Sequence, residues 1–121
     1  METPLQEPTF WILTALAGPP LHGYGIIREV AALSEGRLSM RPGTLYGALD
    51  RLVEAGLIEA DREEVVDGRL RRYYRLSAAG SATLAAETER LRRNVEAATA
   101  RLANLTPAAR PIAPRALGGL A

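Results

Sequence analysis

The sequence predicts a mainly α-helical α+β fold with one β-hairpin, and three patterns lead to this prediction. Residues 8–55 hold three stretches in which apolar side chains recur at helical spacing, with glycine or proline after each. Residues 57–76 form two strand-like runs around Asp67-Gly68, a dipeptide typical of tight hairpin turns. Residues 77–105 return to a helical pattern of much greater length.

Three short helices are expected first. The first spans residues 8–17 and is ended by a Gly-Pro-Pro sequence, and the second spans residues 23–33. The third begins near Pro42, because proline suits the first position of a helix. It continues to about Ala55, where Gly56 supplies the C-terminal stop.

The hairpin and a long helix follow. The two strands are expected in residues 57–64 and 69–76. Ser77 is a good N-cap for the long helix, since its hydroxyl can accept a hydrogen bond from a backbone N–H of the first turn. The helix is expected to end at about Leu105, because Pro107 prevents its continuation.

Three short helices, a hairpin and a long helix are the order of a winged helix-turn-helix followed by a dimerisation helix. We therefore expect a winged helix-turn-helix DNA-binding domain in residues 1–76 and a dimerisation helix in residues 77–106. Residues 107–121 are expected to form a disordered tail, because they hold three Pro and two Gly without a periodic pattern.

The composition excludes several classes of protein. The chain has no cysteine, which rules out disulfides and thiolate metal sites, and His22 is its only histidine. Because no cluster of titratable residues suggests a site, the sequence predicts neither an enzyme nor a bound metal or cofactor. The acidic Glu2 and Glu7 do not suit a signal peptide, and the longest apolar stretch, residues 10–17, is too short to cross a bilayer. We expect a soluble, cytoplasmic protein.

The distribution of charge says more than the net charge of +1. Residues 1–36 carry one Arg and four Glu, whereas the second strand carries four Arg and no acidic residue. Arg69, Arg71 and Arg72 lie near the turn, where a wing meets phosphate, and are expected to contact DNA. Arg75 is expected to pair with acidic residues of the first strand, and such cross-strand pairs are the alternative explanation for much of this charge.

The third helix has an apolar side and an opposite side of small and polar residues, at 100° per residue. The apolar side, which must pack inward, holds Leu45, Ala48, Leu49 and Leu52. The outward side holds Gly43, Gly47, Asp50 and Glu54, flanked by Thr44, Tyr46 and Arg51.

The two outward glycines need an explanation, since each costs about 1 kcal/mol relative to alanine within a helix. We interpret Gly43 and Gly47 as small residues that let the helix sit deep in a DNA major groove. Thr44, Tyr46 and Arg51 would then reach bases and phosphates, and one further cation, Arg41, stands at the phosphate-attracting helix start. The alternative is that Gly43 lies in the first turn, where a glycine costs little, and that Gly47 is tolerated without a function.

Three motifs together resemble the PadR family of bacterial transcriptional regulators. They are LHGYGI at 21–26, RPGTLYGALDRLVEAGLI at 41–58 and GRLRRYYRLSAAG at 68–80. The resemblance covers residues 8–105, and the sequence departs from the common family pattern at Gly25, Gly47 and Leu70. These departures leave the expected fold unchanged and put the details of base contact in question.

The resemblance implies a homodimer whose third helices enter successive major grooves of double-stranded DNA at a pseudo-palindromic operator. It places His22 and Tyr24 at the start of the second helix, where a Tyr hydroxyl can reach phosphate, with a packing role as the alternative. The sequence looks like the short branch of the family, which keeps one C-terminal helix. Family members often act as repressors, and some respond to small aromatic compounds.

The long helix carries an apolar seam with the 4-3 spacing of a heptad repeat, formed by Leu84, Thr88, Leu91, Val95, Ala98, Leu102 and Leu105. A helix of roughly 40 Å exposes such a stripe beyond a small domain, so burial against an identical helix is expected. Phe10 and Trp11 are expected to join this interface. Packing on its own domain is the alternative near Leu84.

The resemblance implies an effector site beside the first helices, but Trp11 suits an interface core better than a ligand platform.

The sequence therefore predicts a sequence-specific DNA-binding transcriptional regulator, expected to act as a repressor, with a small aromatic effector as one form of control. The alternative is a winged-helix protein-interaction module without direct DNA binding. The acidic first strand and the low net charge favour that alternative.

Overall fold

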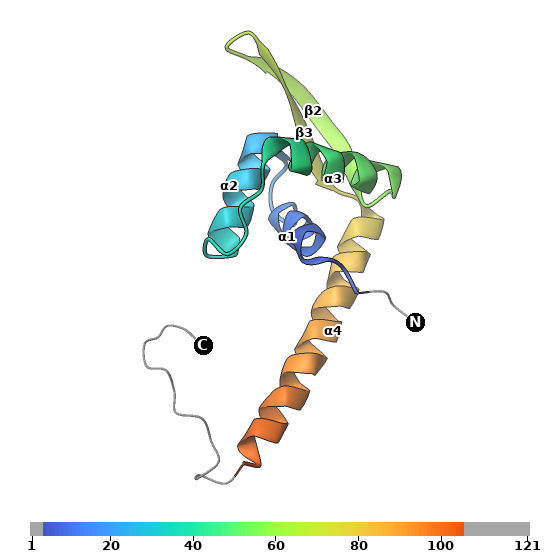
Figure 1. Cartoon of the computed structure of the whole chain (residues 1–121). Helices are drawn as coiled ribbons and strands as arrows, with labels where there is room; N and C mark the ends of the chain where they lie inside the picture. Colours follow the sequence, from blue (N-terminus) through green and yellow to red (C-terminus); the bar gives the residue numbers. More distant parts are fainter. Residues whose placement is uncertain (1–3, 106–121) are drawn as a thin grey trace. The chain divides into compact units, whose positions relative to one another are not determined.

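The structure is a computed structural model that describes residues 4–105. Its elements are α1 (Glu7–Ala15), β1 (Leu21–His22), α2 (Gly23–Leu33), α3 (Pro42–Glu54), β2 (Ile58–Val66), β3 (Arg69–Leu76) and α4 (Ala78–Ala103), shown in Figure 1. The expected α+β fold is confirmed. The expected disordered tail, residues 107–121, lies outside the described residues.

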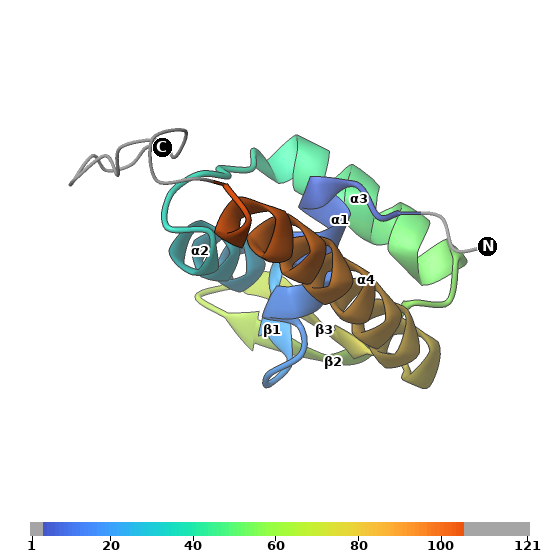
Figure 2. The ribbon, with the colours of Figure 1, turned by 90° about the horizontal axis from the view of Figure 1, so that it is seen from below.

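The described residues divide into two compact units, residues 4–88 and residues 89–105, with the boundary inside α4. In the first unit α1 packs beside α2, and both views show these two helices next to each other (Figures 1 and 2). The strands of this unit form one three-stranded antiparallel sheet, in the order β1-β3-β2. Among residues 4–105, none of the helices is both long and apolar enough to cross a membrane.

The core of the first unit forms where the apolar sides of the helices meet. The side of α3 that was expected to pack inward is buried in full, and α1 contributes Ile12, Leu13 and Leu16. Tyr74 of β3 is also buried. Leu84 of α4 and Trp11 of α1 are partly buried against the same core.

The hairpin of β2 and β3, residues 58–76, is called the wing below. Asp67 and Gly68 have φ angles of 53° and 74°, as the predicted tight turn requires. A β-bulge lies at Asp61, because Ala60 is opposite Tyr74 while Arg62 is opposite Tyr73. Strand β2 extends beyond its expected end to Val66, whereas β3 has its expected bounds.

Strand β1 was not expected from the sequence. Leu21 and His22 pair with Tyr74 and Tyr73 of β3, which makes the hairpin a three-stranded sheet. Two residues are too few to show the alternation by which a strand is recognised. This strand depends on its partner and carries no local signal.

The start of α4 is tied to the turn between α3 and β2. Ser77 Oγ accepts a hydrogen bond from the backbone N–H of Gly80 at 3.0 Å, which confirms Ser77 as the N-cap. The same hydroxyl donates to the carbonyl oxygen of Gly56. A Cβ at Gly80 would lie 1.9 Å from the backbone oxygen of Leu57, so only glycine fits at this contact.

Replacing Gly80 by alanine is expected to destabilise the protein by about 1–3 kcal/mol or more, because the new methyl group overlaps a backbone atom that cannot turn aside. The free energy of unfolding, measured by urea titration followed by circular dichroism, tests this. Ser81→Ala is the control, because Ser81 is exposed in the same turn and its substitution should change stability by no more than about 0.5 kcal/mol. Equal stability of the two variants would contradict the close approach at Gly80.

Candidate nucleic-acid interface

The wing, α3 and the start of α2 surround an open groove of about 680 Å³, called the α3–wing groove below. It is lined by His22, Gly23, Tyr24, Tyr46, Asp50, Val66, Asp67, Arg69, Leu70, Arg71, Arg72 and Tyr74. Six of these residues were predicted from the sequence to contact DNA, namely His22, Tyr24, Tyr46, Arg69, Arg71 and Arg72. The groove thus brings together side chains from three separate segments of the chain.

The remaining predicted DNA contacts lie on α3 or at its start. Arg41 is the N-cap residue and is exposed, and Gly43, Thr44 and Arg51 are exposed as well. Gly47 is half-buried, and within residues 4–105 the one side-chain atom near a Cβ placed there is the Nη1 of Arg51, at 3.7 Å. In the same part of the chain, a Cβ at Gly43 would meet no atom outside its own turn of helix within 4 Å. Packing within residues 4–105 therefore requires neither glycine.

Tyr46 connects α3 to the start of α2. A Cβ at Gly23 would lie 2.3 Å from the Tyr46 hydroxyl oxygen, so the glycine makes room for the phenol. Tyr46 nevertheless keeps 46% of its surface exposed, and Tyr24 keeps 57%. Both phenols are thus available on the lining of the α3–wing groove.

His22 lies at the junction of β1 and α2, with its ring edge-to-face to Tyr73 at a centroid distance of 5.2 Å. Burial is the main reason why the pKa of His22 is lowered, and the nearby guanidinium groups of Arg71 and Arg28 lower it further. Glu64 acts in the opposite direction. Near neutral pH the imidazole is therefore uncharged, and the positive charge here comes from the arginines.

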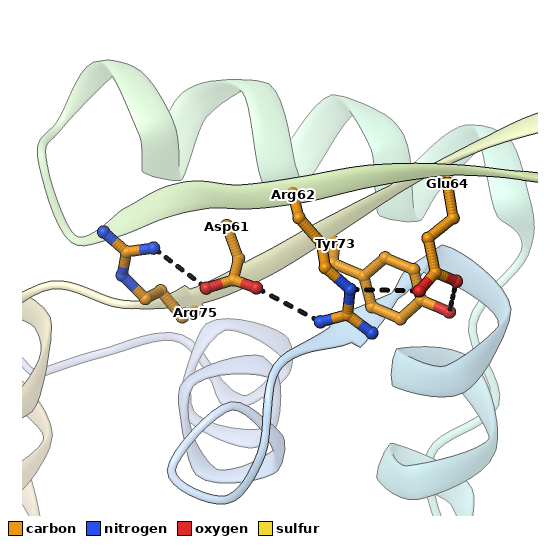
Figure 3. A network of polar contacts seen from close by, with 5 residues as sticks. All are labelled: Asp61, Arg62, Glu64, Tyr73 and Arg75. Carbon is orange, nitrogen blue, oxygen red and sulfur yellow. Dashed lines mark hydrogen bonds and ion pairs between the residues drawn. The ribbon is translucent and has the colours of Figure 1, made fainter.

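One face of the wing carries a chain of polar contacts that runs along its length (Figure 3). Arg75 Nη1 donates to Asp61 at 2.9 Å, and Arg62 donates to both Asp61 at 3.2 Å and Glu64 at 3.1 Å. The Tyr73 hydroxyl donates to Glu64 at 3.1 Å, and the Arg62 guanidinium lies 3.9 Å from the centre of the Tyr73 ring. Hydrogen bonds from Arg62 and Tyr73 lower the pKa of Glu64.

These contacts separate the arginines of the wing into two groups. Arg75 pairs with Glu59 and Asp61, as expected, and Arg72 pairs with Glu63 through Nε at 3.1 Å. Arg69 and Arg71 are exposed, and among residues 4–105 neither forms an ion pair. The two arginines of the wing without an ion pair in residues 4–105 therefore stand nearest its turn and line the groove.

Arg28 was not among the predicted site residues. It is exposed on α2, and its charge reaches His22 beside the groove. The helical period gives a signal that could have found it, because Arg28 stands opposite Ile26 and Val30, the buried side of the helix. That Arg28 and Arg71 both act on His22 depends on the fold and has no counterpart in the sequence.

The predicted dimer residues of the first unit are partly used within the chain itself. Phe10 and Trp11 stack edge-to-face at 5.3 Å, and the Trp11 indole N–H donates to Glu7 at 3.3 Å. Leu84 packs against the core of its own unit, as the alternative for this residue anticipated. All three are half-buried and retain some exposed surface.

In the second unit the predicted seam is largely exposed. Val95 keeps 63% and Leu102 keeps 56% of their surface, and Ala98 is exposed as well. Leu91 and Leu105 are half-buried. Another set of residues on this helix is charged, with Arg92 paired to both Glu89 and Glu96, and Arg93 paired to Glu89.

Comparison with known proteins adds the following relatives. The profile of the Transcriptional regulator PadR-like family matches residues 12–86. Transcriptional regulator Rv3488 of Mycobacterium tuberculosis is 42% identical over 73 residues, which are 60% of this chain and 64% of that protein. An uncharacterized protein of Lysinibacillus sphaericus is 33% identical over 73 residues, which are 60% of this chain and 67% of that protein. The match thus spans less than two thirds of the mycobacterial regulator.

Solved structures share the fold. A PadR family regulator from Clostridium difficile R20291 has a TM-score of 0.64 at 23% identity, over 78% of this chain and 96% of that chain. Bacillus subtilis PadR in complex with operator DNA has a TM-score of 0.59 at 23% identity, over 68% and 46%. A PadR-like transcription factor from Bacteroides fragilis has a TM-score of 0.65 at 28% identity, over 76% and 86%. The winged-helix fold expected from the sequence is thereby confirmed.

Replacing Gly47 by alanine is expected to raise the free energy of unfolding by about 1 kcal/mol, because alanine is the better helix former and the new Cβ meets only an exposed arginine. Urea titration followed by circular dichroism measures the change. Gly43→Ala is the matched comparison and should gain less, because Gly43 lies in the first turn. A Gly47→Ala variant less stable than the wild type would show that the fold requires this glycine.

Proposed function

Because the chain belongs to the PadR-like family of transcriptional regulators, we propose that it binds operator DNA as a homodimer and represses transcription. Members of this family regulate transcription and are not enzymes. The observation that carries DNA binding is a set of exposed arginines without ion pairs in residues 4–105. Arg69 and Arg71 of the wing line the α3–wing groove, and Arg41 and Arg51 stand at the start and on the exposed side of α3. Phosphate is the partner that such guanidinium groups suit best.

The helix α3 and the wing would contact different parts of the DNA. A major groove about 12 Å wide admits an α-helix, and the exposed side of α3 with Thr44 and Arg51 suits that position. Gly43 and Gly47 would let the helix backbone approach the base edges closely. Arg69 and Arg71 of the wing would bind phosphates or enter the minor groove. Bacillus subtilis PadR, which shares the fold, was solved on operator DNA, and this supports the same use here.

The homodimer is proposed from the exposed seam of the second unit. Val95 and Leu102 are large apolar side chains with more than half of their surface exposed. Their heptad spacing is typical of helices that pack against a copy of themselves. A twofold dimer would read a pseudo-palindromic operator, with one half-site for each protomer. Regulation of chromosomal genes would place the protein in the cytoplasm.

Relief of repression by a small aromatic compound is proposed from the family resemblance alone. The arrangement of Trp11 does not favour a ligand platform. Its ring packs partly against the core, contacts Phe10 and is held by a hydrogen bond to Glu7. An interface role suits Trp11 better.

A protein-interaction module is the second candidate, and the acidic strand was the observation in its favour. In the structure, however, Glu59, Asp61, Glu63 and Glu64 all pair with arginines of the wing. The acidic residues of β2 are therefore held in ion pairs, whereas Arg69 and Arg71 near the turn form none in residues 4–105. This difference favours a polyanion as the partner.

The proposed function is tested by retardation of DNA from the promoter of the protein's own gene at increasing salt. If about 8 phosphates are neutralised per dimer, log K should fall against log[salt] with a slope near −7. Arg71→Ala should weaken binding to all duplexes similarly and flatten the slope, whereas Arg51→Ala should reduce the preference for operator over random DNA. Gly47→Ala should lower operator affinity although it stabilises the fold.

Arg75→Ala is the control for this experiment. Because Arg75 pairs with Glu59 and Asp61, its replacement should leave the salt slope unchanged. Binding that does not respond to salt would contradict the proposal. So would a wild type that retards no DNA. If Arg71 changed sequence preference while Arg51 did not, the roles of α3 and the wing would be reversed.

The dimer is tested by placing the same charge on either of two adjacent exposed alanines of α4. Ala98→Asp puts a carboxylate in the seam and should convert the dimer to a monomer, because the charge would lose its hydration on association. Ala97→Asp lies off the seam and should leave the dimer intact while lowering helix propensity equally. Sedimentation equilibrium gives the masses. A wild-type monomer, or equal behaviour of the two variants, would refute the predicted seam.

A further inference from the structure

We propose that Asp50 determines part of the operator sequence by accepting a hydrogen bond from the amino group of a cytosine in the major groove. This inference rests on the proposed function, because it assigns a specificity-determining residue to the same surface. Three observations carry it: the position of Asp50 on α3, its lack of a partner, and the donors that a major groove offers.

The position of Asp50 is central on the outward side of α3. Gly43, Gly47 and Asp50 follow one another along the middle of this side, at steps of four and three residues. Because the two glycines have no side chain, Asp50 is the first side chain on this line from the N-terminal end of the helix. It is exposed, and it lines the α3–wing groove together with Tyr46. A close approach of α3 to bases would bring this short carboxylate with it.

The carboxylate of Asp50 is not used within the chain. In residues 4–105 it forms neither an ion pair nor a hydrogen bond. The adjacent Arg51 turns back along the helix, with Nη1 3.7 Å from the Cβ position of Gly47. The acidic residues of β2, by contrast, are engaged by arginines. Asp50 is thus an uncompensated negative charge in the middle of a surface proposed to meet a polyanion.

A negative charge is favourable against DNA only where it meets a hydrogen-bond donor. The donors that the bases expose in the major groove show which base the carboxylate of Asp50 can contact. Guanine offers acceptors there, and thymine offers an acceptor and a methyl group. Adenine offers N6–H₂ beside the acceptor N7, a pair that an amide matches and a carboxylate does not, because a carboxylate has no donor for N7. Cytosine offers N4–H₂, to which an aspartate accepts a hydrogen bond without facing a second acceptor of that base.

The experiment selects bound sequences from a random duplex library with the wild type, Asp50→Asn, Asp50→Ala and the control Glu54→Gln. The wild-type motif should contain one cytosine per half-site that depends on Asp50. Asp50→Ala should lose the preference at that position by roughly 5- to 150-fold, with the other positions unchanged. Asp50→Asn should exchange the cytosine for adenine, because its amide both donates and accepts.

Glu54→Gln removes a carboxylate from the same side of α3, one turn further along, and should leave the motif unchanged. Circular dichroism of all four proteins should show the same melting temperature, because Asp50 and Glu54 are exposed. If Asp50→Ala binds every duplex more tightly by one factor and keeps the wild-type motif, Asp50 only repels phosphate and the inference is wrong. A wild type that retains no duplex would overturn the proposed function itself, and the inference with it.

Discussion

Burial of one side of α3 is the constraint on which the functional surface depends. Leu45 and Leu49 are fully buried, and Leu52 is 7% exposed. Burial of a leucine contributes about 1.5–3 kcal/mol, so turning α3 to expose all three would cost about 5–9 kcal/mol. A small domain has a total stability of about 5–15 kcal/mol. The rotation of the helix is therefore fixed, and with it the residues that face outward.

The wing depends on a second constraint, which is the register of its two strands. Without the bulge at Asp61, the pairing of Ala60 with Tyr74 would continue by placing Arg62 opposite Arg72. The bulge shifts β2 by one residue, so that Glu63 is opposite Arg72 and Arg62 is opposite Tyr73. A repulsive pair is thereby replaced by an ion pair and a cation–π contact, which stabilise the hairpin modestly. In the same register the acidic residues of β2 pair with arginines, whereas Arg69 and Arg71 near the turn form no ion pair in residues 4–105.

The sequence was sufficient where the signal is local. Helical period identified the buried side of α3, and Asp67-Gly68 identified the turn, because both depend on neighbours within a few residues. Strand β1, the bulge and the joint effect of Arg28 and Arg71 on His22 were not predictable, since each depends on contacts between distant segments. The partner of Arg72 was likewise hidden, because a shift of one residue decides which acidic side chain it meets. The sequence therefore predicted the hairpin correctly but did not distinguish Arg72, which forms an ion pair, from Arg69 and Arg71, which form none in residues 4–105.

Glycines show most clearly what the structure adds to the sequence. At Gly80 an added Cβ would meet a backbone oxygen at 1.9 Å, and at Gly23 it would displace Tyr46. The fold explains these two glycines. At Gly43 and Gly47 an added Cβ would meet nothing closer than 3.7 Å, while a glycine within a helix costs about 1 kcal/mol. No contact in residues 4–105 offsets that cost at Gly47. Under the proposed function, a partner that approaches the backbone of α3 closely, as base edges in a major groove do, would offset it.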